Sequence, residues 1–232
     1  MVANAWDADA KNVTVTVDKA KEIRSQFSVV LERTVSELNG KPCIELEEVG
    51  QPRQQIMVSR SFGSEVTELE DLAESVAYFT TRAAEKLRRD GSVAVSLCVH
   101  IRTNPFKEDE QQYQRSIIVP LNQPSDDTTK LVNAAVMGLK EIYRSSGFRY
   151  KKSGVLLMGL QAKGTIQATL FDDPVEQEKS ANLMRIMDAV NRRMGQGSLT
   201  LAASGIRQRW AMRRDRKSPN YTTDWNELPV AW

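Results

Sequence analysis

The chain has 232 residues, 41% of them apolar, and a formal net charge of only +2. This length and apolar content are sufficient for one or two domains with a buried core. Because the net charge is small, any affinity for nucleic acid must come from local clusters of Lys and Arg. Two widely separated cysteines, Cys43 and Cys98, and a single histidine, His100, argue against a disulfide framework and against a zinc site.

Membrane and secretion signals are absent from the sequence. No apolar run approaches the ~20 residues that cross a bilayer, and the N-terminus lacks a charged segment followed by an apolar one. We therefore expect a cytoplasmic protein with no membrane partner.

The first predicted helix spans residues 26–39, where apolar side chains recur on one face and Asn39-Gly40 supplies a stop signal. Residues 45–55 are acidic and then rich in Gly, Pro and Gln, which is typical of a linker. This pattern predicts a first unit over residues 1–50. Within it, residues 13–17 alternate as a strand does.

Between residues 54 and 160 the hydrophobic periodicity indicates six successive elements. It predicts a strand over 55–62, a helix over 68–89, strands over 93–102 and 113–121, a helix after the capping residues 125–127, and a strand over 148–160. This order is the βαββαβ plan of an α+β, ferredoxin-like domain. Since each helix has one apolar face, both should cover the same side of a four-stranded sheet and leave the other side open.

The open side is expected to be basic. In the strand over 93–102 the apolar residues point one way, and the other face carries small and polar side chains that end in His100 and Arg102. The basic residues expected to form this surface are Arg60, Arg102, Arg115, Arg149, Lys151 and Lys152. Such side chains neutralise a phosphate backbone without reading bases. For any single one of them, the alternative is an ordinary solvated strand residue.

An RNA-recognition sheet is disfavoured by the same strand. Modules of that kind stack bases on aromatic side chains of the central strands. Residues 93–102 offer no outward aromatic, and the candidates Tyr113 and Tyr150 belong to other strands. Contact with the nucleic-acid backbone is therefore the better prediction.

A short motif follows the last strand of this domain. Gln167 precedes the adjacent pair Leu170 and Phe171, between Gly164 and an Asp-Asp-Pro turn at residues 172–174. An exposed aliphatic and aromatic pair can anchor a peptide in an apolar groove, while the glutamine amide fixes its register. The alternative is that Leu170 and Phe171 cover the end of the sheet.

The C-terminal region is predicted to contain a helix over 176–194, a short strand over 198–202 and a basic tail. Six basic residues and one acidic residue lie between positions 207 and 217, and the tail carries the aromatics Trp210, Tyr221 and Trp225. Cations interleaved with rings suit a phosphate-rich or acidic partner. Alternatively, these aromatics fold back onto their own domain.

The tail also contains a recognisable sequence motif. Trp210 and Met212, followed by Ser-Pro-Asn-Tyr-Thr-Thr at 218–223, closely resemble the C-terminal signature of UmuC-type proteins. These are the catalytic subunits of bacterial SOS-induced translesion DNA polymerases of the Y family. Residues 167–171 resemble the peptide by which bacterial DNA polymerases hold the sliding clamp. Residues 150–155 resemble the little-finger domain of this family, and residues 29–43 resemble the end of its thumb.

The resemblance implies a domain plan and a set of partners. It assigns residues 1–50 to a thumb-like remnant, 51–163 to the little finger, 164–174 to a clamp-binding peptide and 175–232 to a UmuC-specific extension. The implied partners are primed or damaged DNA at the sheet and the sliding clamp at Gln167, Leu170 and Phe171. A UmuD′-like dimer and a RecA filament are implied at the tail aromatics. The implied location is the bacterial nucleoid.

Catalysis in this family needs two Mg²⁺ ions on carboxylates of a palm domain. The sequence shows neither palm nor fingers, and Asp126-Asp127 is better explained as a helix cap. We therefore expect no cofactor and no polymerase activity from this chain alone. Two functions remain open: the DNA- and clamp-binding C-terminal portion of such a polymerase, or a free-standing nucleic-acid-binding or regulatory module in which Leu170 and Phe171 are structural.

Overall fold

The computed structural model describes residues 23–24, 26–43, 52–165, 174–206, 208–212, 218–222, 224 and 227–228. The chain divides into two units, Met1–Pro52 and Arg53–Trp232. In the first unit, helix α2 spans Val29–Leu38, and the Ser28 hydroxyl caps it by accepting from the Leu31 backbone N–H. The predicted helix is confirmed, with a start three residues later than expected. The strand predicted over 13–17 lies outside the described residues.

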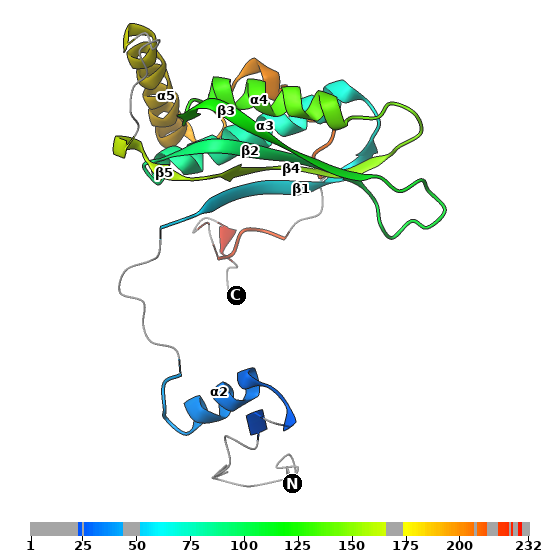
Figure 1. The fold of residues 1–232 in the computed structure, drawn as a ribbon, viewed down its shortest axis with the longest axis vertical. Helices are drawn as coiled ribbons and strands as arrows, with labels where there is room; N and C mark the ends of the chain where they lie inside the picture. The colour runs from blue at the N-terminus through cyan, green and yellow to red at the C-terminus, as the bar shows by residue number, and fades with distance from the viewer. Residues whose placement is uncertain are drawn as a thin grey trace. The chain divides into compact units, whose positions relative to one another are not determined.

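The second unit contains the predicted βαββαβ order (Figure 1). Its elements are β1 (Gln55–Val66), α3 (Leu69–Arg89), β2 (Ser92–Thr103), β3 (Gln114–Ser125), α4 (Thr128–Ile142) and β4 (Tyr150–Met158). The predicted cap of α4 is confirmed, because the Asp127 side chain accepts from the backbone N–H groups of Thr129 and Lys130. The α+β class is therefore confirmed.

The sheet order is β1-β4-β2-β3, and all neighbouring strands are antiparallel. It follows that β1 and β2 run in the same direction with β4 between them, and that β3 and β4 do so with β2 between them. The domain thus consists of two interleaved βαβ units. A short additional strand, β5 (Gln161–Ala162), pairs with the start of β2. Because β2 and β4 are central, their side chains dominate both faces of the sheet.

Helices α3 and α4 lie over one face of this sheet (Figure 1). Leu97, Val99 and Ile101 of β2 are fully buried beneath them, as are Val155 and Leu157 of β4. The expectation that both helices cover the same face is confirmed. No helix of the described residues covers the opposite face of the strands, and Met57 and Ile118 on that face are 52% and 61% exposed.

The C-terminal region adds helix α5 (Pro174–Met194) and the short 3-10 helix η2 (Ala202–Ser204). The strand predicted over 198–202 does not form. Instead the Leu199 N–H donates to Asn191 Oδ1 at 2.8 Å, and Asn191 Nδ2 donates to the Leu199 carbonyl at 2.9 Å. A side chain of α5 thereby satisfies the peptide groups that a partner strand would otherwise satisfy.

Candidate nucleic-acid interface

The open face of the sheet is basic at its centre. Arg102 of β2 and Lys152 of β4 are register partners, and His100 pairs with Gly154 in the same way. Directly paired residues of antiparallel strands point to the same face, so these side chains share the open side. Across β1, β2, β3 and β4 the sequence places five Lys or Arg residues and only one acidic residue, Glu65 near the end of β1.

A shallow hollow of about 470 Å³ lies on this face. Its lining includes Met57, Cys98, His100, Arg102, Gln114, Arg115, Ser116 and Lys152. The side chains between the cations are small or neutral, so an extended polyanion can approach the sheet closely. The hollow therefore suits a phosphate backbone better than a flat aromatic ligand.

Two of the predicted basic residues do not share this face. Arg60 is the register partner of Ser153, and the hydroxyl of Ser153 lies 2.9 Å from that of Ser75 on α3. Arg115 is the register partner of the buried Ile101. Both arginines thus belong to the helix-covered side of edge strands. The prediction that all six cations share one face is wrong for these two, although Arg115 also borders the hollow from β3.

Two further predicted cations take part in intramolecular contacts. Arg149 lies 3.5 Å from Glu65 and 3.7 Å from Glu110, and Lys107 pairs with the same two carboxylates at 2.6 and 2.8 Å. The hydrogen bond from Lys107 lowers the pKa of Glu65. Lys151 Nζ donates to a backbone carbonyl of β1 at 3.4 Å. The charge of Arg149 is therefore already partly compensated, whereas Arg102 and Lys152 both line the hollow of the open face.

Trp210 of the predicted tail motif is part of the core. Only 3% of it is exposed, and its ring packs on those of Phe62, Tyr78 and Phe79, with centroid distances of 6.1, 5.5 and 5.2 Å. Its carbonyl accepts from the Gly63 N–H at 3.1 Å. The prediction that Trp210 anchors a partner is wrong, because its ring is buried in its own domain. The flanking basic residues concealed this apolar position in the sequence.

The remaining predicted contact residues are less constrained by the structure. Tyr221 is 45% exposed and so remains accessible to a partner. Gln167, Leu170, Phe171 and Trp225 lie outside the described residues.

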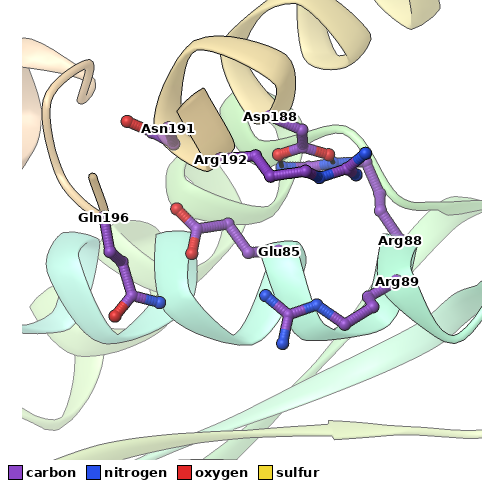
Figure 2. Close-up of a pocket in the computed structure, with 7 residues that line it drawn as sticks. All are labelled: Glu85, Arg88, Arg89, Asp188, Asn191, Arg192 and Gln196. Carbon is purple, nitrogen blue, oxygen red and sulfur yellow. Dashed lines mark hydrogen bonds and ion pairs between the residues drawn. The ribbon is translucent and has the colours of Figure 1, made fainter. Parts of the chain in front are cut away.

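A polar junction joins α5 to the sheet domain (Figure 2). The Arg88 guanidinium binds both carboxylate oxygens of Asp188, at 2.7 and 2.8 Å, and its third nitrogen donates to the Asp126 carbonyl and the Thr128 hydroxyl. The Arg88 side chain is only 9% exposed. Sequence reasoning missed this contact, since its two charged partners are 100 residues apart.

Comparison with known proteins gives the family. Residues 53–170 match the impB/mucB/samB family C-terminal domain. The chain belongs to the impB/mucB/samB family. Residues 181–231 match a further domain described only as a domain of unknown function, DUF4113. The first match covers the whole βαββαβ domain, and the second covers most of α5 and the tail.

Relatives in this family are similar along most of the chain. UmuC of Salmonella typhimurium is 43% identical over 206 residues, which are 89% of this chain and 49% of that protein. SamB of Salmonella typhimurium and MucB of Escherichia coli are each 42% identical over 209 residues, or 90% of this chain and 49% of the relative. The chain thus spans about half the length of these impB/mucB/samB relatives. The resemblance predicted from the tail motif is confirmed.

Two other features are absent from the part of the chain that the structure describes. This part contains no group of three or more His, Cys, Asp or Glu side chains that could hold a metal ion. None of its helices is long and apolar enough to cross a membrane.

Proposed function

We propose that the chain is the DNA- and clamp-binding C-terminal portion of an error-prone translesion DNA polymerase subunit of the SOS response. The observation that carries this proposal is the open face, where Arg102 and Lys152 lie side by side on central strands that contain no carboxylate. Membership of the impB/mucB/samB family supports it. The chain supplies binding, and we assign no catalytic residue and no metal ligand to it.

The proposed contact with DNA is electrostatic and independent of sequence. Arg102 and Lys152 stand on adjacent strands, which are about 4.8 Å apart, and each forms one ion pair with the phosphate backbone. Cations that bind phosphates fix the position of a duplex without reading its bases. Such a contact suits a polymerase that copies damaged templates, because contacts to phosphates do not depend on the structure of the bases.

The remaining contacts are proposed from the family resemblance. Gln167, Leu170 and Phe171 bind the sliding clamp, and Tyr221 and Trp225 contact a UmuD′-like dimer or a RecA filament. Bound to DNA and clamp, the protein resides at the bacterial nucleoid. Mg²⁺ and nucleotide chemistry belong to the palm and fingers of such a polymerase and need no ligand here.

The salt dependence of DNA affinity tests the open face. The double variant Arg102→Ala/Lys152→Ala is compared with the wild type by fluorescence anisotropy on primed duplex DNA between about 50 and 200 mM salt. Losing two phosphate contacts should reduce the slope of log affinity against log salt by roughly two. The control Lys130→Ala/Lys140→Ala removes the same charge from exposed positions of α4. Equal slopes for both double variants would contradict the proposal.

Clamp binding separates the proposal from a free-standing nucleic-acid-binding module. The wild type should retain the bacterial sliding clamp in a pull-down, and the triple variant Gln167→Ala/Leu170→Ala/Phe171→Ala should lose it. Unchanged retention, or none by the wild type, would favour the free-standing module.

A further inference from the structure

The hollow on the open face contains the only histidine of the chain. Gly154 of β4 is the register partner of His100 on one side and of Ser59 of β1 on the other. A Cβ at Gly154 would collide with the His100 ring and with the Ser59 side chain. The glycine therefore makes room for the imidazole between the central strands. This places the ring next to both well-placed cations of the open face.

The groups that face His100 are cationic or neutral. Arg102 follows it on β2, Lys152 faces it from β4, and Arg115 borders the hollow from β3. Its register partner Ser116 is neutral, and burial raises the pKa of the Cys98 thiol, which keeps that group neutral as well. The only carboxylate on the four strands, Glu65, is held by Lys107 near the end of β1.

This arrangement has a clear electrostatic result. Burial, followed by the charges of Lys152 and Arg102, lowers the pKa of His100 below its ordinary value of 6.5. These effects favour the neutral imidazole in the free protein. An anion placed between these three residues would compensate the two charges that repel the imidazolium, so it would favour protonation of the ring.

We propose that the hollow binds a single backbone phosphate of DNA, and that His100 takes up a proton from solvent as the phosphate enters. The choice of DNA as the source of the phosphate rests on the proposed function of the open face. A phosphodiester has two non-bridging oxygens that accept from several donors at once. Arg102, Lys152 and the protonated imidazole supply charged donors, while Gln114 and Ser116 supply neutral ones.

The proposal predicts the sign of a pH effect. Below the pKa of free His100 the ring is already protonated, and affinity for DNA is at its higher limit. Above the pKa of the DNA-bound form no proton is taken up, and affinity is at its lower limit. Between these values affinity falls as pH rises, and the two limits differ tenfold for each unit by which DNA raises the pKa.

The first experiment compares wild type with His100→Gln, which keeps an amide donor but cannot be charged. DNA affinity is measured by anisotropy from about pH 5 to pH 8 at constant ionic strength. The wild type should bind more tightly at the acidic end by at least several-fold, whereas His100→Gln should show a flat profile close to the wild-type value at pH 8. Matching profiles for the two proteins would overturn the proposal.

A second measurement does not depend on a variant. Because the chain has one histidine, its imidazole proton resonances can be titrated by NMR with and without a short primed duplex. Bound DNA should raise the pKa of His100. An unchanged pKa overturns the phosphate site but leaves the proposed function intact if the Arg102→Ala/Lys152→Ala slope still falls. Absence of DNA binding at every pH overturns both.

Discussion

On β2, successive side chains enter two different environments. Leu97, Val99 and Ile101 are fully buried under α3 and α4, whereas His100 and Arg102 face the open side. The buried face holds the domain together through apolar packing, whereas Arg102 and Lys152 on the open face form no ion pair with any carboxylate in the described part of the chain. Substitutions on the buried face should therefore change stability, and those on the open face should change DNA affinity. The following predictions test that separation.

The largest effect is expected where the tail completes the core. Trp210→Ala removes a buried ring from its contacts with Phe62, Tyr78 and Phe79. We expect the free energy of unfolding to fall by about 3–5 kcal/mol, measured by urea denaturation. The control Tyr221→Ala removes an aromatic that is 45% exposed and should change it by less than about 0.5 kcal/mol. Similar losses for the two variants would show that Trp210 is not a core residue.

A single strand pair allows the two faces to be compared directly. Leu97 of β2 is fully buried, whereas Ile118 on the open side of β3 is 61% exposed. Leu97→Ala should lower the free energy of unfolding by about 2–5 kcal/mol, and Ile118→Ala by less than about 1 kcal/mol. Thermal and chemical denaturation both report this difference. A large loss from Ile118→Ala would mean that another part of the molecule covers the open face.

The junction at Arg88 should contribute an intermediate amount. Arg88→Ala leaves Asp188 without its bidentate partner, but the Asp188 side chain is 23% exposed, so water compensates part of the loss. We expect a cost of about 1–3 kcal/mol and faster hydrogen exchange in α5 than in α4. Arg89→Ala, at the exposed next position of α3, is the matched control. Unchanged exchange in α5 would show that other contacts hold this helix.

The compensated and uncompensated cations should differ in DNA binding. Arg102→Ala is expected to reduce the salt slope by roughly one, the value of a single phosphate contact. Arg149→Ala should reduce it by less, because Glu65 and Glu110 already lie near that guanidinium. Anisotropy at several salt concentrations measures both. A larger effect at Arg149 would place the DNA beside the start of β4 and away from the hollow.

The smallest effect concerns the acidic residue of the strands. The pKa of Glu65 lies below its ordinary value of 4.5, so its contribution to stability is complete above pH 4.5 and is lost as pH falls through the folded-state pKa. Glu65→Gln should therefore be less stable than wild type at pH 7, and the difference should shrink below pH 4.5. Denaturation curves at pH 7 and near pH 3 test this. If the stability difference between wild type and Glu65→Gln does not vary with pH, the negative charge of Glu65 does not contribute to stability.

The sequence by itself determined the local structure. Apolar spacing predicted every helix and strand of the βαββαβ domain, because periodicity reflects which side of an element is buried. Asp127 was identifiable as a cap since its capping contacts, to Thr129 and Lys130, lie within three residues. The outward position of His100 and Arg102 followed from simple alternation along β2.

Only the tertiary structure decided which side chains meet. The sides of Arg60 and Arg115 depend on register with Ser153 and Ile101, across strands distant in sequence. The placement of Lys152 beside Arg102 depends on β4 lying next to β2. The burial of Trp210, with Phe62, Tyr78 and Phe79 around it, depends on how the tail returns to the domain. Each is a contact between residues that are distant in sequence. Local sequence patterns do not identify such partners, because the packing of the whole domain determines which residues meet.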